Sequence, residues 1–185
     1  MSLTQRLVPT YAQMLRALSG WLDKAREQGG AEADGLMSRR LAADMYPLSS
    51  QVRFACLQAR EAIHRLRGEP LPPALDDLAR EGREAGERPG SILDAEGCIA
   101  EALARLDAVA PDELDAGAGL PVTLTLPTGM VFDMTGEDYA RDWALPQFYF
   151  HLVTAYAILR SQGVPLGKAD YVPHMFGYLR PGTAA

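Results

Sequence analysis

Apolar residues recur every three or four positions through most of this chain, a spacing typical of helices with one buried face. The first such stripe covers about residues 3–27 and ends before a pair of glycines, which favours a helix stop. The second stripe covers residues 48–66 and ends at Gly68. We expect Asp44 to cap this second helix, with Pro47 in its first turn.

Two more helices are predicted in the second half of the chain. Ser91 and Asp94 form a capping-box pattern at the start of an apolar stripe that ends at Pro111. The last stripe predicts a main helix from about residue 146 to 162, after a short helical turn around residues 138–143. A glycine and a proline follow this helix and prevent its continuation.

The remaining elements complete a mostly α fold class. Apolar and polar residues alternate at 122–126 and 130–134 around a short glycine-containing turn, which predicts a small β-hairpin. A charged segment at 74–84 predicts a further helical piece on the surface, which we expect Leu75 and Leu78 to anchor. We therefore predict a four-helix bundle with a small β-hairpin inserted before the last helix. One domain is expected over residues 1–171, followed by a C-terminal tail over residues 172–185.

Composition narrows the class of protein. The chain has 185 residues, of which 48% are hydrophobic, and this suits one domain with a buried core. Its net charge is −6 and it has no basic stripe, so we expect no nucleic-acid partner. No apolar run reaches the roughly 20 residues of a membrane span, and the N-terminus lacks a signal-peptide pattern. We therefore expect a cytoplasmic protein with no membrane partner.

Cys56 and Cys98 are the only cysteines, and both fall on apolar helical faces. Reduced and buried thiols are the expected state. A disulfide or a reactive thiol is the alternative.

The most informative segment for chemistry is residues 147–151, which place one metal-capable imidazole in the most aromatic part of the chain. Helical spacing puts His151 on the same face as Gln147, so we expect its ring to face the interior or a cleft. Gln51 falls on the apolar side of the second helix and is expected to point inward, where a buried amide needs partners. A hydrogen-bonded core histidine is the alternative to a ligand or catalytic group at His151.

A different face of the second helix carries His64 together with Arg53, Leu57, Arg60 and Arg67. This face looks solvated, and we expect no functional role for His64.

Three segments of the chain resemble a known bacterial family. They are Leu7-Val8-Pro9 with Leu18 and Leu22, then Leu41-Ala-Ala-Asp44-Met45-Tyr46-Pro47-Leu48 with Gln51, and finally Leu145-Pro-Gln-Phe-Tyr-Phe-His151 through Gly163-Val-Pro-Leu-Gly-Lys-Ala-Asp170. Over about residues 1–171 the chain resembles the family called "domain of unknown function nineteen-ninety-three". That family is placed in the DinB/YfiT-like superfamily of metalloenzymes, so the resemblance implies a four-helix bundle that often forms homodimers.

The resemblance also implies a metal site, and this chain departs from it. Typical superfamily members bind a divalent metal, usually zinc or nickel, through three histidines. His151 matches one of them, whereas Gln147 and Gln51 stand where the resemblance implies the other two. An amide oxygen is a poor zinc ligand compared with imidazole, so the zinc site looks degraded unless Asp44 or another carboxylate joins it. A harder divalent ion, or no metal, is the alternative.

Two hypotheses about function follow from the resemblance. In the first, the protein is a divalent-metal-dependent or thiol-dependent transferase-like enzyme that binds a small polar molecule near these three side chains. Tyr149 or Tyr46 would donate hydrogen bonds there, and His151 would be the catalytic base. In the second, the protein is a non-catalytic, dimeric small-ligand-binding or structural bundle with a degenerate metal site. Neither hypothesis gives His174 or Lys168 a role.

Overall fold

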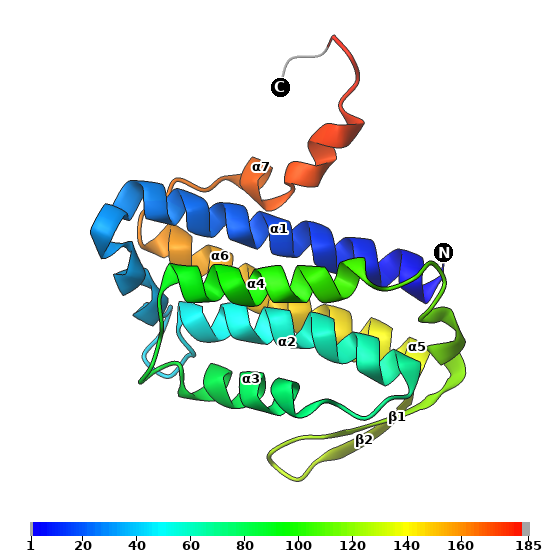
Figure 1. Ribbon diagram of the computed structural model, residues 1–185. Coiled ribbons are helices and arrows are strands. Elements are labelled where there is room, and N and C mark those ends of the chain that lie inside the picture. Colours follow the sequence, from blue (N-terminus) through cyan, green and yellow to red (C-terminus); the bar gives the residue numbers. More distant parts are fainter. Residues whose placement is uncertain (1, 183–185) are drawn as a thin grey trace.

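The computed structural model describes residues 2–182 and is mainly helical (Figure 1). The longer helices are α1 (Leu3–Gly29), α2 (Leu48–Arg67), α3 (Pro73–Glu84), α4 (Ile92–Asp107) and α6 (Leu145–Ser161). The shorter elements are β1 (Pro121–Thr125), β2 (Val131–Thr135), α5 (Gly136–Asp138), α7 (Lys168–Tyr171) and 3₁₀ segments at Gly30–Ser38, Asp115–Gly119 and Pro173–Tyr178. A π-helical segment, Tyr139–Ala144, joins α5 to α6. The predicted fold class, mostly α with one late hairpin, is confirmed.

Four helices form the bundle, and α3 packs outside it. In Figure 1, α1 and α6 run in one direction, whereas α2 and α4 run in the other. Helix α2 packs against α3, α4 and α6, and α1 packs against α4 and α6. The chain therefore crosses the bundle between the end of α1 and the start of α2. Among the described helices, none combines the length and the apolar character needed to cross a membrane.

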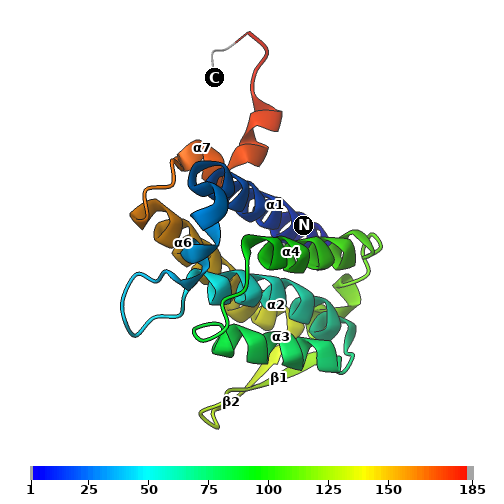
Figure 2. The same ribbon diagram turned by 60° about the vertical axis from the view of Figure 1, so that its left-hand side comes forward.

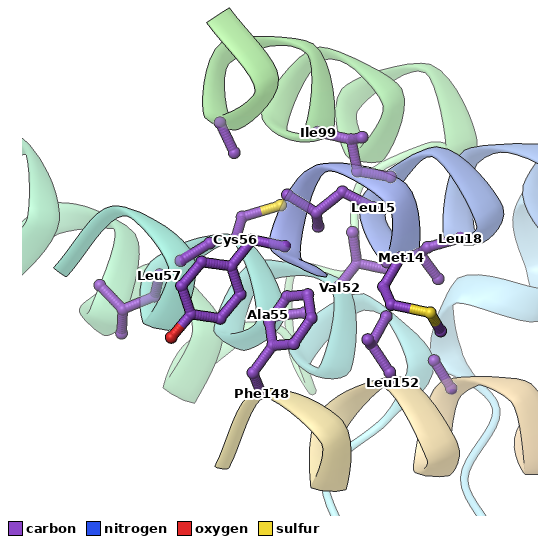
Figure 3. Close-up of a cluster of buried hydrophobic side chains, with 14 of the residues drawn as sticks. Met14, Leu15, Leu18, Val52, Ala55, Cys56, Leu57, Ile99, Phe148 and Leu152 are labelled. Carbon is purple, nitrogen blue, oxygen red and sulfur yellow. The ribbon is translucent and has the colours of Figure 1, made fainter. Parts of the chain in front are cut away.

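The core lies where α1, α2, α4 and α6 meet. Each of these helices contributes almost fully buried side chains, and Figure 3 shows part of this cluster, including Met14, Val52, Ile99 and Phe148. Full burial of one such side chain stabilises the fold by about 1.5–3 kcal/mol. Phe148 and Leu152 of α6 are both fully buried, so their positions fix how the neighbouring face of α6 meets α2.

The start of α2 differs from the sequence prediction. The helix begins at Leu48, with Pro47 as the residue before its first turn, and no side chain caps it. Pro47 has an extended backbone (φ −71°, ψ 172°), so the helix cannot begin earlier. Asp44 lies exposed in the preceding loop. The prediction that Asp44 caps α2 is therefore wrong.

The arginine-bearing face of α2 is covered, because α3 and α4 pack over it (Figure 2). Arg60 is only 7% exposed, and its Nη2 lies 2.9 Å from Oε1 of Glu101 on α4. His64 is half-buried, with its Nδ1 3.0 Å from Oε2 of Glu69. Leu75 and Leu78 anchor α3 as the sequence predicts, but α3 lies over this face of α2, so the expectation of a solvated face is wrong.

The last helical region is continuous from Gly136 to Ser161, whereas the sequence predicts a separate short turn before the main helix. Thr135 caps its start, since its Oγ1 accepts a hydrogen bond from the Asp138 N–H at 3.2 Å. Pro146 has no N–H to donate to the preceding turn, and the helix widens to π geometry just before it. The helix therefore continues through Pro146 without a break.

The β-hairpin joins the bundle through closely approaching backbones. β1 and β2 pair antiparallel, with Leu124 opposite Phe132. A Cβ added at Gly136 would lie 2.0 Å from the Gly117 carbonyl oxygen, and one added at Gly117 would lie 2.0 Å from the Leu66 carbonyl oxygen. Only glycine at positions 136 and 117 lets the backbone after β2 approach the end of α2 this closely.

Replacing Gly136 by alanine tests this junction. Gly136→Ala should destabilise the fold by about 2 kcal/mol, because the added methyl group meets a backbone oxygen that cannot rotate away. Gly97→Ala is the matched control, since Gly97 is exposed on α4 and nothing lies within 4 Å of its added Cβ. The control should stabilise the fold by about 0.5–1 kcal/mol. Free energies of unfolding in urea measure both changes, and equal values would contradict the account of the junction.

Candidate functional site

Gln51 and His151 meet where the first turn of α2 packs against α6. Oε1 of Gln51 lies 2.9 Å from Nδ1 of His151. On its other side, Nε2 of Gln51 donates a hydrogen bond to the Tyr46 carbonyl oxygen at 3.1 Å. Gln51 is only 2% exposed, so both bonds form away from bulk water. An unpaired amide at such a place would cost about 1–3 kcal/mol, which makes the pairing obligatory.

The bond to Tyr46 determines the protonation of His151. A backbone carbonyl only accepts hydrogen bonds, so the NH₂ group of Gln51 faces Tyr46 and its oxygen faces His151. An amide oxygen also only accepts, and Nδ1 of His151 must therefore carry the proton and donate it. In the neutral ring, Nε2 keeps its lone pair for a ligand, a proton or a metal ion.

The surroundings of His151 keep its ring neutral. Burial lowers the pKa of His151 from its ordinary value of 6.5 to about 4. The imidazole is therefore uncharged near pH 7 and serves as a hydrogen-bond acceptor. It is a weak general base, because the pKa that suits proton abstraction lies near the working pH.

Aromatic rings surround the imidazole. The Phe54 ring centre lies 5.1 Å from that of His151, and the Phe150 ring meets it edge-on at 5.4 Å. Tyr46 packs against Phe54 in turn, with ring centres 5.3 Å apart. Tyr46 and Phe150 are 47% and 56% exposed, so these two rings reach the surface where α6 meets the loop before α2. The site combines one polar acceptor with an apolar, aromatic border.

Gln147, Asp44 and Tyr149 are not hydrogen-bonded to this pair. Gln147 lies half-buried one turn before His151 on the same helix face, and no hydrogen bond within residues 2–182 joins it to His151. Asp44 is exposed in the loop before α2. Tyr149 is two positions from His151 and faces elsewhere, with its ring against Phe148 at 5.9 Å. Burial raises the pKa of Tyr149.

Lys168 and His174 lie away from this pair along the chain, in α7 and in the 3₁₀ segment that follows it. Helix α7 packs against α1, and its Tyr171 stacks on Trp21 with ring centres 5.6 Å apart. The structure gives neither Lys168 nor His174 a contact with Gln51 or His151. Both residues remain without a role at the site.

The donor atoms do not fit a zinc centre. In the part of the chain that the structure describes, no three histidine, cysteine, aspartate or glutamate side chains gather as metal ligands would. His151 supplies one imidazole nitrogen, and the amide of Gln51 already binds the other nitrogen of that ring. A structural or catalytic zinc needs at least three such protein ligands.

Phe54 is the site residue that the sequence pattern alone does not single out. It lies one turn after Gln51 on α2, and its ring contacts both Tyr46 and His151. Phe54 follows Gln51 by three residues, so helical spacing places the two side chains on the same face of α2. That spacing is the sequence signal that could have predicted Phe54 as a site residue. Tyr46 contributes its backbone carbonyl and its ring to the site.

Comparison with known proteins agrees with the resemblance drawn from the sequence. The family model described as "Domain of unknown function (DUF1993)" matches residues 3–172. Among solved structures, the chain is similar to a DinB family member protein from Shewanella denitrificans, with 29% sequence identity and a TM-score of 0.73. This similarity covers 99% of the present chain and 96% of the other. No curated protein matches the chain.

Acid should weaken the fold through His151. The unfolded chain, with a histidine pKa near 6.5, binds more protons than the folded protein, in which the pKa is about 4. The stability that depends on a neutral His151 is therefore fully present above about pH 6.5. As the pH falls from 6.5 toward 4, the free energy of unfolding should decrease by about 1–3 kcal/mol. Urea unfolding at several pH values measures it. His151→Gln should flatten this pH dependence, and an unchanged slope in the variant would contradict the assignment.

The two glutamines should contribute unequally to stability. Gln51→Ala leaves the buried Nδ1–H of His151 unpaired and should lower the free energy of unfolding by about 2 kcal/mol. Gln147→Ala removes a half-buried side chain and should change it by about 0.5 kcal/mol or less. Parallel urea titrations compare the variants. A larger loss from Gln147→Ala would show that Gln147 is the structural partner.

Proposed function

We propose that this chain, which belongs to the family described as "Domain of unknown function (DUF1993)", binds a small molecule at Nε2 of His151. The observation that carries the proposal is the bond from Nδ1 of His151 to Gln51, because it leaves Nε2 unprotonated. The ligand would donate one hydrogen bond to this nitrogen.

The border of the site defines the chemical class of the ligand. Phe54, Phe150 and Tyr46 present rings around the imidazole, and two of these three are about half exposed. Rings favour a flat, apolar body through burial and edge-to-face contacts. A small aromatic or apolar molecule with a hydroxyl, amine or thiol donor fits both features.

A divalent-metal-dependent or thiol-dependent transferase-like enzyme is the second candidate. It is favoured by the Nδ1–H bond to an amide oxygen, since metal-bound histidines commonly donate their other N–H to such a group. The donor set argues against it, because one imidazole with the nearby Gln147 amide would hold zinc weakly. The low pKa of His151 also makes this ring a poor acceptor for a thiol proton.

Elemental analysis and thermal shifts on purified, tag-free protein test these candidates together. We expect no stoichiometric zinc, nickel, manganese or magnesium. We expect phenol to raise the melting temperature, and its donor-free counterpart toluene to raise it less. The difference should vanish in His151→Leu, whose side chain has no acceptor, and persist in His64→Leu, because His64 pairs with Glu69 away from the site.

The opposite outcomes decide between the two candidates. Stoichiometric metal that is lost in His151→Leu would favour the metal-dependent candidate and would make thiol-transfer assays the next step. Equal shifts from phenol and toluene would sink the proposed acceptor role of His151.

A further inference from the structure

The two cysteines face each other across the interface of α2 and α4. These helices run in the same direction, and the ion pair between Arg60 and Glu101 at 2.9 Å fixes their register. Cys56 lies one turn before Arg60, and Cys98 lies one turn before Glu101. The same register therefore brings the two thiols together, and the Cys56 thiol is placed to donate a hydrogen bond to the Cys98 sulfur.

The two thiols differ in access to solvent. Cys56 is fully buried in the cluster that Figure 3 shows, which also contains Leu15 and Ile99. Cys98 is half-buried and lines a cavity of about 280 Å³ between α2, α3 and α4, together with Arg60, Leu78 and Glu101. A small molecule entering this cavity would reach Cys98 first.

The charges around the pair favour a thiolate at Cys98. The hydrogen bond from the Cys56 thiol lowers the pKa of Cys98, and the guanidinium groups of Arg53 and Arg60 lower it further, against the opposing effects of burial and Glu101. The same hydrogen bond, together with burial, raises the pKa of Cys56. Cys98 is also the sulfur that lines the cavity, so it is the one placed to act as the nucleophile.

We propose that Cys98 is an oxidation site for a small hydroperoxide, and that Cys56 resolves the oxidised residue to an internal disulfide between α2 and α4. This inference rests on neither candidate function of the His151 site.

The chemistry balances in two steps. The Cys98 thiolate attacks one peroxide oxygen, the O–O bond breaks, and a sulfenic acid forms, while the leaving hydroxide or alkoxide takes up a proton from solvent and becomes water or alcohol. The Cys56 sulfur then attacks the sulfenic sulfur, the S–O bond breaks, and the thiol proton leaves with the hydroxyl group as water. The two thiols lose two electrons in total, and the peroxide gains them.

Intact-mass spectrometry of the folded, reduced protein treated with hydrogen peroxide tests this proposal. We expect a mass loss of about 2 Da, the signature of a two-electron dithiol oxidation, and its reversal by dithiothreitol. Either Cys56→Ser or Cys98→Ser should abolish the loss. In Cys56→Ser the sulfenic acid has no resolving thiol, so dimedone should label Cys98, whereas Cys98→Ser should remain unlabelled.

Three results would overturn the proposal. The first is an unchanged mass in the folded protein under conditions that oxidise the urea-unfolded chain. The second is a stable gain of oxygen at Cys98 in the native protein without the 2 Da loss, which would remove the resolving role of Cys56. The third is dimedone labelling of Cys56 in Cys98→Ser at the rate seen for Cys98 in Cys56→Ser. Circular dichroism of both serine variants confirms that these comparisons are made on folded protein.

Discussion

Helix α2 is covered by α3, α4 and α6, so little water reaches its inward polar side chains, and a partner within the protein stabilises those that find one. Two of these pairings link α2 to other helices of the bundle. Gln51 binds His151 of α6, and Arg60 binds Glu101 of α4. These polar pairs therefore help to place α4 and α6 against α2, in addition to the hydrophobic contacts between the helices. The candidate site and the cysteine pair both follow from this one constraint.

The Gln51–His151 pair shows how an amide changes the chemistry of a helical-bundle site. In the DinB/YfiT-like superfamily, the resemblance implies three histidines around a divalent metal, whereas this chain presents one imidazole and two amides. An amide oxygen holds the imidazole by its Nδ1–H and leaves a neutral Nε2 on a ring that contacts Phe54 and Phe150. Such an arrangement favours an uncharged ligand with a donor group over a strongly bound cation.

Helical periodicity was enough to predict the bundle and the inward faces that carry Gln51 and His151, and two-residue alternation was enough to predict the hairpin. The capping of α2 by Asp44 was mispredicted, because local pattern does not show that the backbone stays extended through Pro47. The arginine face was expected to be solvated, because the pattern that predicts Leu75 and Leu78 as anchors of α3 does not show that they dock over this face of α2. The pairing of Cys56 with Cys98 depends on the register between two helices distant in sequence, which no local spacing specifies.

The tautomer of His151 tests the central claim most directly. Long-range ¹H–¹⁵N correlation spectra of protein with labelled histidine, recorded at pH 7, distinguish the two neutral forms and the imidazolium. The account predicts a neutral ring protonated at Nδ1, with Nε2 bare, and predicts that Gln51→Leu abolishes this preference. An imidazolium, or a ring protonated at Nε2 in the unaltered protein, would contradict the hydrogen bond on which the proposed site depends.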